Sequence, residues 1–154
     1  MTSRRGFTLP ELLIVMSILA VLFSLVSLSL LGGQHQLSVA SSLSQLIADA
    51  KLQQSKAMWG DTEGRDSTDS YGIYLNSNQY ILFHGSAYSA GDPDNVVIDL
   101  DSGAVLSPIQ SFIFAKGSGE IMNYDPDADT ITISSISDSK TLEFNQYGVI
   151  TRND

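Results

Sequence analysis

The chain of 154 residues carries a formal net charge of −9, and 43% of its residues are apolar. Because an acidic chain is repelled by nucleic acid phosphates, we expect it to bind no nucleic acid. The sequence has no cysteine, which excludes disulfides and thiolate metal sites.

The first predicted element is an apolar helix close to the N-terminus. Leu12 to Leu31 is a run of twenty residues without a charge. As a helix, this run is about 30 Å long, which matches the hydrocarbon core of a bilayer. Arg4 and Arg5 precede it and predict an N-terminus in the cytoplasm. Residues 32–154 hold six Lys or Arg against sixteen Asp or Glu and are expected to be extracytoplasmic.

This N-terminal segment has three interpretations. The first is an uncleaved single-pass anchor for an extracytoplasmic binding domain, in which Glu11 reaches the lipid headgroups. The second is a twin-arginine secretory signal peptide, but the apolar run is longer than usual and Leu30-Leu31-Gly32-Gly33 offers no A-x-A cleavage site. The third interpretation is based on a glycine–phenylalanine junction that is followed by an acidic residue at a fixed distance.

That third pattern lies in Gly6-Phe7-Thr8-Leu9-Pro10-Glu11-Leu12-Leu13, which closely resembles the prepilin signal of type IV pilins and type II secretion pseudopilins. The resemblance implies that a prepilin peptidase cuts after Gly6 and that Phe7 is N-methylated. It also implies that Glu11 neutralises the new amine of a neighbouring subunit, in surroundings whose low dielectric strengthens the pair. The chain would then be a structural subunit, with no cofactor and no enzymatic activity.

The resemblance also implies a location and partners. The subunit would first lie in the cytoplasmic (inner) membrane and then in a pilus or pseudopilus. Its partners would be the prepilin peptidase/methylase, other pilin or pseudopilin subunits, an inner-membrane assembly platform and the lipid bilayer. The choice between pilus and pseudopilus stays open, as does the choice between major and minor subunit. Phe114-Ala115-Lys116-Gly117 and Tyr147-Gly148-Val149-Ile150 resemble the H-type minor pseudopilin, and the cysteine pair of many major type IV pilins is missing.

After the apolar run, Gly32-Gly33 is interpreted as a flexible joint within one long helix, with a helix end and a linker as the alternative. Helical periodicity resumes at once, and the predicted amphipathic helix ends at Gly60. Its apolar stripe comprises Leu37, Ala40, Leu43, Ile47 and Ala50, widened by Val39 and Leu46. Residues 60–70 are predicted to be an exposed, mobile loop.

From residue 71 the apolar pattern has a period of two, which predicts strands. Residues 71–75 and 80–83 predict a hairpin, and further strands are expected at 96–100, 111–115, 121–124, 130–134, 141–145 and 149–151. The fold class is therefore α+β, a long N-terminal helix packed on antiparallel β-sheet, as in pilins. The predicted parts are a leader (1–6), a transmembrane and filament-core helix (7–31), an amphipathic helix (32–59) and a β-rich globular domain (60–154).

The acidic turns are the candidates for a metal site. Asp125, Asp127 and Asp129 alternate and can present oxygens to calcium, although the glycine and glutamate of an EF-hand are absent. The alternative is an exposed turn between two strands. Asp92-Pro93-Asp94 is a second such stretch.

No catalytic constellation is present in the sequence. His35 and His84 are the only histidines, so a zinc site would need carboxylates from distant places in the chain. The large aromatic residues are interpreted as core or helix–sheet contacts, with a subunit interface as the alternative; they are Trp59, Tyr71, Tyr74 and Tyr80.

Overall fold

The computed structural model describes residues 8–101, 103–136 and 138–153, and the side chains of residues 25–38 and 153 lie outside that description. The predicted leader and the processing residues Gly6 and Phe7 also lie outside the described residues. The chain divides into two units, residues 1–34 and 35–154, each of which is described by itself.

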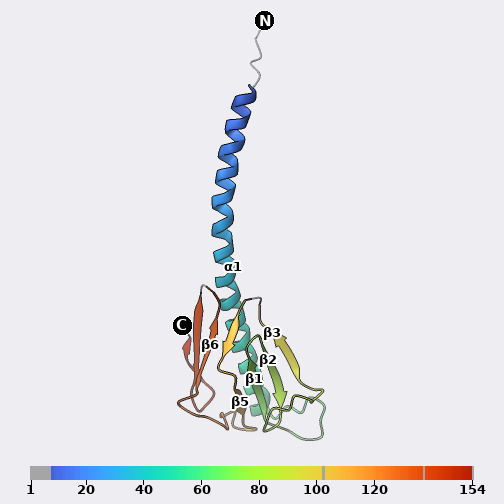
Figure 1. Ribbon diagram of the computed structural model, residues 1–154. Helices are drawn as coiled ribbons and strands as arrows, with labels where there is room; N and C mark the ends of the chain where they lie inside the picture. The colour runs from blue at the N-terminus through green and yellow to red at the C-terminus, as the bar shows by residue number, and fades with distance from the viewer. Residues whose placement is uncertain (1–7, 102, 137, 154) are drawn as a thin grey trace. The chain divides into compact units, whose positions relative to one another are not determined.

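The described residues form one helix followed by strands, which confirms the α+β class. The helix α1 spans Leu9–Trp59. Two antiparallel four-stranded sheets follow, with strand orders β3-β2-β1-β5 and β4-β6-β7-β8 (Figure 1). The strands are β1 (Tyr71–Asn76), β2 (Gln79–His84), β3 (Val96–Asp99), β4 (Val105–Ser107), β5 (Ser111–Phe114), β6 (Thr130–Ser134), β7 (Ser139–Phe144) and β8 (Ile150–Asn153).

The backbone of α1 remains helical through Gly32 and Gly33, so the alternative of a helix end and linker at this point is wrong. Flexibility at the two glycines stays a prediction. A search of the described residues finds no helix with the length and apolar character needed to cross a membrane.

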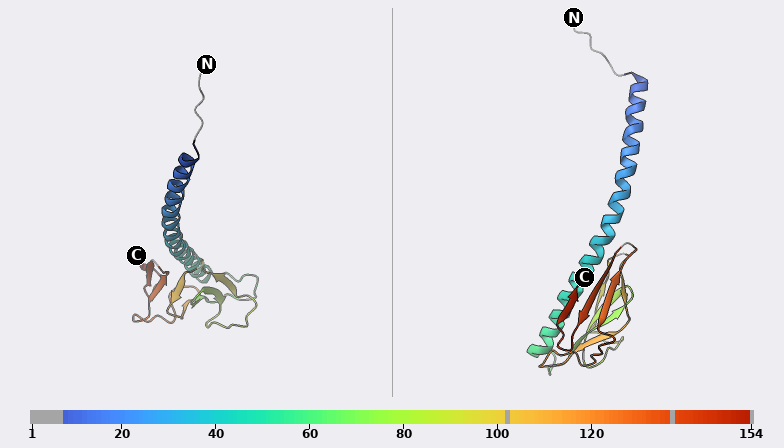
Figure 2. Two further views of the ribbon diagram at one scale, coloured as in Figure 1. Left: turned by 45° about the horizontal axis from the view of Figure 1, so that its top comes forward. Right: turned by 90° about the vertical axis from the view of Figure 1, so that its left-hand side faces the viewer.

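One hydrophobic core joins the second half of α1 to both sheets. The helix contributes Val39, Leu43, Leu46, Ala50 and Ala57. The strands contribute Ile73, Leu75, Tyr80, Leu82, Phe112 and Phe114 from the first sheet, and Leu106, Ile131, Ile133, Leu142 and Phe144 from the second. Figure 2 shows the strands of both sheets beside this part of α1. The buried stripe differs from the predicted one at Ala40, which is exposed, because the stripe is centred on Val39 and Leu46.

The helix ends at Trp59, where the sequence predicts its end, in a left-handed turn. Gly60 has φ +67°, a conformation that is free of strain only for glycine. The N–H of Asp61 donates to the carbonyl of Lys56 over 3.0 Å, which is the bond of a Schellman motif. The N–H of Gly117 donates to the carbonyl of Ala57 over 2.8 Å. Carbonyls at the end of α1 therefore have donors from outside the helix.

The hairpin prediction is confirmed, since β1 and β2 pair from Tyr71↔His84 to Asn76↔Gln79. Residues 121–124 are not a strand, and Ile121 makes only an isolated bridge with Phe114. The side chain of Asn123 explains this, because its amide donates to the carbonyl of Ser111 over 2.7 Å and its oxygen accepts from the N–H of Ile113 over 3.3 Å. A side chain thus replaces the backbone partner of a strand.

The aromatic residues divide between core and surface. Tyr71 and Tyr80 are buried as predicted, and Tyr74 is half-buried and stacks on Tyr88 with 4.2 Å between ring centroids. Trp59 is 87% exposed, so its assignment to the core is wrong. The Tyr80 hydroxyl donates to Asp49 Oδ2 over 2.5 Å. Burial, followed by this bond and the charge of Asp49, raises the pKa of Tyr80.

Gly72→Ala is expected to lower the free energy of unfolding by about 1–3 kcal/mol, the usual cost of overpacking. A Cβ at Gly72 would lie 2.3 Å from the ring of Phe83 and 2.9 Å from the carbonyl oxygen of Phe112. The measurement is chemical denaturation of the full chain in detergent micelles, followed by circular dichroism. Gly91→Ala is the control, because a Cβ there meets nothing within 4 Å. Equal stability of the two variants would contradict the packing argument.

Candidate functional site

The start of α1 contains the predicted assembly residue, Glu11. The backbone N–H of Thr8 donates to Glu11 Oε2 over 3.4 Å. The carbonyl of Thr8 accepts from the N–H groups of Glu11, over 3.1 Å, and of Leu12, over 3.2 Å. Thr8-Leu9-Pro10-Glu11 therefore has the T-x-x-E pattern of a capping box, with the carboxylate at the positive end of the helix dipole. The sequence analysis missed this role, although the four residues themselves carry the signal.

Apolar side chains cover the helix beyond this cap. Each large apolar residue from Leu9 to Phe23 is exposed, with fractions between 42% for Leu19 and 75% for Leu9. They are Leu9, Leu12, Leu13, Ile14, Val15, Met16, Ile18, Leu19, Val21, Leu22 and Phe23. These positions surround the helix instead of forming one stripe. A surface of this size and kind marks contact with a membrane or with other apolar helices.

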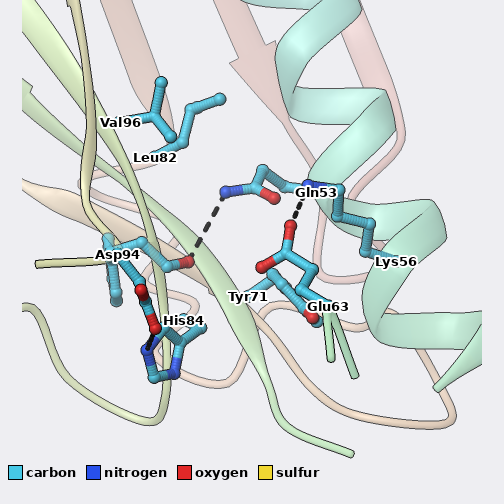
Figure 3. A pocket seen from close by; sticks show the side chains of 9 residues that line it. Gln53, Lys56, Glu63, Tyr71, Leu82, His84, Asp94 and Val96 are labelled. Atoms are coloured by element: carbon cyan, nitrogen blue, oxygen red, sulfur yellow. Dashed lines mark hydrogen bonds and ion pairs between the residues drawn. The ribbon is translucent and has the colours of Figure 1, made fainter. Parts of the chain in front are cut away.

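A separate polar cavity of about 30 Å³ lies in the second unit, between α1 and the end of β2 (Figure 3). It is lined by Gln53, Lys56, Glu63, Tyr71, Leu82, Phe83, His84, Asp94 and Val96. Gln53 reaches the cavity from α1 and donates to the carbonyl of Gly72 over 3.1 Å. The cavity therefore brings together side chains from the helix, the loop after it and the first sheet.

Ion pairs hold the loop of residues 60–70 against this cavity, so the prediction of a mobile loop is not supported by its contacts. Lys56 pairs with Glu63, and Arg65 pairs with the other oxygen of Glu63 over 3.2 Å. Arg65 also donates to the hydroxyl of Tyr71 over 2.8 Å, and that hydroxyl donates to the carbonyl of Asp61 over 2.8 Å. The first half of the loop, from Asp61 to Arg65, is thus held by charged or polar side chains.

These contacts change the pKa values of two groups. Burial alone would raise the pKa of Glu63, but the hydrogen bonds and charges of Lys56 and Arg65 lower it below its usual range. Burial, and then the charge of Glu63, raise the pKa of Tyr71. The carboxylate is therefore stabilised in its charged form and the phenol in its neutral form.

His84, at the end of β2, is surrounded by carboxylates. Its Nδ1 lies 3.2 Å from Asp69 Oδ2. Its Nε2 lies 3.3 Å from Asp92 Oδ2 and 3.6 Å from Asp94 Oδ2. The sequence analysis noted that a zinc site would need carboxylates from distant places, and the fold brings such carboxylates to His84. Within the part of the chain that the structure describes, His84, Asp92 and Asp94 are the group with ligand atoms close enough to hold a metal.

The acidic stretch that sequence analysis preferred is a local turn. The N–H of Asp127 donates to Asp125 Oδ1 over 3.0 Å. Asp129 accepts from the hydroxyls of Thr130, over 3.0 Å, and Tyr124, over 3.4 Å. The structure therefore confirms the turn before β6, and calcium binding by Asp125, Asp127 and Asp129 stays a prediction.

Residues 1–31 match the family model described as the prokaryotic N-terminal methylation motif. This motif is the signal of type IV pilins and pseudopilins, so the resemblance found in the sequence is confirmed at that level. No curated protein and no solved structure matches the chain. The H-type minor pseudopilin resemblance stays a prediction.

Glu63→Gln is expected to destabilise the fold at pH 7 by up to about 1 kcal/mol, the upper range for a partly exposed ion pair. Because the folded-state pKa of Glu63 is lowered, its contribution is present above the unfolded value of about 4.5 and is lost as the pH falls through the folded value. The difference between wild type and variant should therefore shrink as the pH falls below about 4.5. Denaturant unfolding across this range measures it.

Glu120→Gln is the control, since Glu120 is exposed and no ion pair of it occurs among the described residues. The ion-pair explanation fails if both variants show the same difference from wild type at every pH.

Proposed function

We propose that this chain, whose first 31 residues carry the methylation signal, is a structural subunit of a type IV pilus or a type II secretion pseudopilus. In this proposal the chain is cleaved after Gly6 and N-methylated at Phe7. The observation that carries the proposal is the continuous apolar surface around residues 9–23, directly after the signal. Such a surface serves assembly and not catalysis.

Before assembly, this apolar helix anchors the subunit in the inner membrane. The support is the uncharged run of twenty residues from Leu12 to Leu31, the last part of which has side chains outside the described residues. Arg4 and Arg5 keep the N-terminus in the cytoplasm, and the acidic residues 32–154 are on the other side.

During assembly, apolar helices of neighbouring subunits replace the lipid. A helix with apolar residues on all sides suits both environments, because dispersion contacts with lipid chains and with helices are similar. The subunit therefore leaves the bilayer without exposing this surface to water.

The charged end of the helix sets the register of this packing. Cleavage after Gly6 creates a cationic amine at Phe7, four positions before Glu11. Only Oε2 of Glu11 is engaged by the N–H of Thr8. Among the described residues the second oxygen of the carboxylate has no partner, and we propose that it pairs with the amine of a neighbouring subunit, a pair that low dielectric strengthens.

Processing is tested by intact mass and N-terminal sequencing of the full chain produced together with a prepilin peptidase. We expect a chain that begins at methylated Phe7. Gly6→Ala should be cut more slowly and Gly6→Val hardly at all, because the peptidase site must accept the side chain at this position. A wild-type chain that still begins at Met1 would instead favour an uncleaved, membrane-anchored binding domain.

Two substitutions of Glu11 separate its charge from its role in the cap. Glu11→Gln keeps an oxygen that accepts from Thr8, whereas Glu11→Ala removes both the charge and the cap. An unpaired charge in low dielectric costs about 3–5 kcal/mol, so we expect both variants to be cleaved but to enter filaments at least about a hundredfold less often. The measurement is the fraction of variant subunit in sheared filaments that also contain unmodified subunits.

If Glu11→Gln assembles normally and only Glu11→Ala fails, the cap matters and the charge does not. Normal assembly of both variants would remove both roles from Glu11.

A further inference from the structure

We propose that His84, Asp92 and Asp94 bind a divalent transition-metal ion, with Asp69 as the residue that orients the imidazole. The ligands come from the end of β2 and from the loop of residues 85–95 that leads to β3. The ligands lie in the second unit and outside the apolar part of α1, so this site does not rest on the proposed assembly function.

The distances from His84 Nε2 to the two carboxylates suit a tetrahedral metal ion. Zinc binds nitrogen and oxygen at about 2.0–2.2 Å, so two ligands of a tetrahedral site lie about 3.3–3.5 Å apart. His84 Nε2 lies 3.3 Å from Asp92 Oδ2 and 3.6 Å from Asp94 Oδ2. All three ligand atoms lie within 4.8 Å of one another.

The orientation of the imidazole leaves the correct nitrogen for a metal. Metal binding through Nε2 requires the proton of a neutral ring to lie on Nδ1, where Asp69 Oδ2, 3.2 Å away, can accept it. In that tautomer Nε2 directs its lone pair toward the carboxylates of Asp92 and Asp94, and a metal ion between them removes the repulsion. A carboxylate–histidine pair behind the ligand nitrogen is the usual support of a metal-binding histidine.

Backbone amides fix two of the three carboxylates that face the ring, those of Asp69 and Asp92. The N–H of Ser70 donates to Asp69 Oδ1 over 2.8 Å. The N–H of Asp94 donates to Asp92 Oδ1 over 3.0 Å. In each case one oxygen is held by the chain and the other, Oδ2, is the atom nearest the imidazole. The carboxylates of Asp69 and Asp92 are therefore arranged before any ion arrives.

The charges around the cavity favour a dication. Glu63 is balanced by Lys56, and Arg65 lies 3.8 Å from Asp94 Oδ2. The remaining charges are the three carboxylates of Asp69, Asp92 and Asp94 and the guanidinium of Arg65. Their sum is two negative charges when the imidazole is neutral. A divalent ion supplies the missing charge.

The cavity beside this cluster is also lined by a buried acceptor, the side-chain oxygen of Gln53. Gln53 is only 2% exposed, and its Oε1 has no hydrogen-bond partner among the described residues. Its Nε2 is held by the carbonyl of Gly72, so the amide cannot turn over without losing that bond. A buried acceptor without a donor is costly, and the cavity has room for one solvent molecule that can donate to it.

The ligand types select the class of metal. An imidazole nitrogen with two carboxylates suits zinc and its first-row neighbours, whereas calcium and magnesium prefer oxygen ligands only. The Asp94 side chain is 54% exposed, so the ion can enter from solvent and keep water as a further ligand. The bound ion would join the β2–β3 loop to the end of β2.

Isothermal titration calorimetry with Zn²⁺ tests the site. The full chain is produced without a polyhistidine tag, stripped with a chelator and kept in detergent micelles, and Ca²⁺ is titrated separately. We expect one Zn²⁺ per chain and weaker binding of Ca²⁺. His84→Gln and Asp92→Asn should each lower the Zn²⁺ affinity more than about a hundredfold, and Asp69→Asn about ten- to a hundredfold.

The chain offers a matched control in its second Asp-Pro-Asp stretch. Asp125 accepts from the N–H of Asp127 over 3.0 Å, as Asp92 does from Asp94. Asp125→Asn removes the same charge from the same turn, and His35→Gln removes the other histidine. Both controls should bind Zn²⁺ as the wild type does, and circular dichroism shows whether each variant is folded.

The proposal is wrong if the wild type does not bind Zn²⁺, or if either control loses binding as His84→Gln does. It is equally wrong if binding survives in both His84→Gln and Asp92→Asn, or if Ca²⁺ binds more tightly than Zn²⁺ and does not need His84.

Discussion

Burial of one stripe of α1 is the contact on which the two sheets depend. Val39, Leu43, Leu46 and Ala50 are each less than 5% exposed, and residues of both sheets pack against them in a single core. A four-stranded antiparallel sheet has one apolar face that must be covered. Here the same helix packs against that face of both sheets. Fully burying each such side chain contributes about 1.5–3 kcal/mol for valine and leucine, so this stripe supplies much of the stability of the second unit.

Two neighbouring glutamines of α1 make hydrogen bonds to different parts of the second unit. Gln53 bonds to Gly72 in β1, while Gln54 Nε2 donates to the carbonyls of Gly119, over 3.0 Å, and Tyr147, over 2.8 Å. Apolar contacts alone tolerate small rotations, whereas hydrogen bonds to fixed carbonyls do not. Close approach requires glycine, since a Cβ at Gly148 would lie 2.5 Å from Gln54 Nε2.

The sequence predicts the features whose signal is local. The period of α1, its end at Gly60 and the hairpin of β1 and β2 depend on residues near one another, and the structure agrees with these predictions. The short strand β4 was missed, because three residues beside Pro108 show too little alternation. Residues 121–124 alternate like a strand, but the side chain of Asn123 takes over the bonds of a neighbouring strand.

The His84 cluster shows where sequence reasoning reaches its limit. Asp92-Pro93-Asp94 and Asp125-Pro126-Asp127 form the same turn with the same 3.0 Å bond, so nothing local distinguishes them. Only the pairing of β1 with β2, which places Tyr71 opposite His84, brings Asp69 to the ring. The Glu11 cap is the opposite case, because its four residues are contiguous and are recognisable as soon as the pattern is sought.

The position of Trp59 has a consequence for spectroscopy. It is the sole tryptophan of the chain and is 87% exposed in the turn that ends α1. An indole already in water changes its surroundings little when the chain unfolds, so its fluorescence is a poor measure of folding. The same exposure makes the emission sensitive to whatever covers the end of the helix. Intrinsic fluorescence of this protein therefore reports the binding of other molecules at the end of α1.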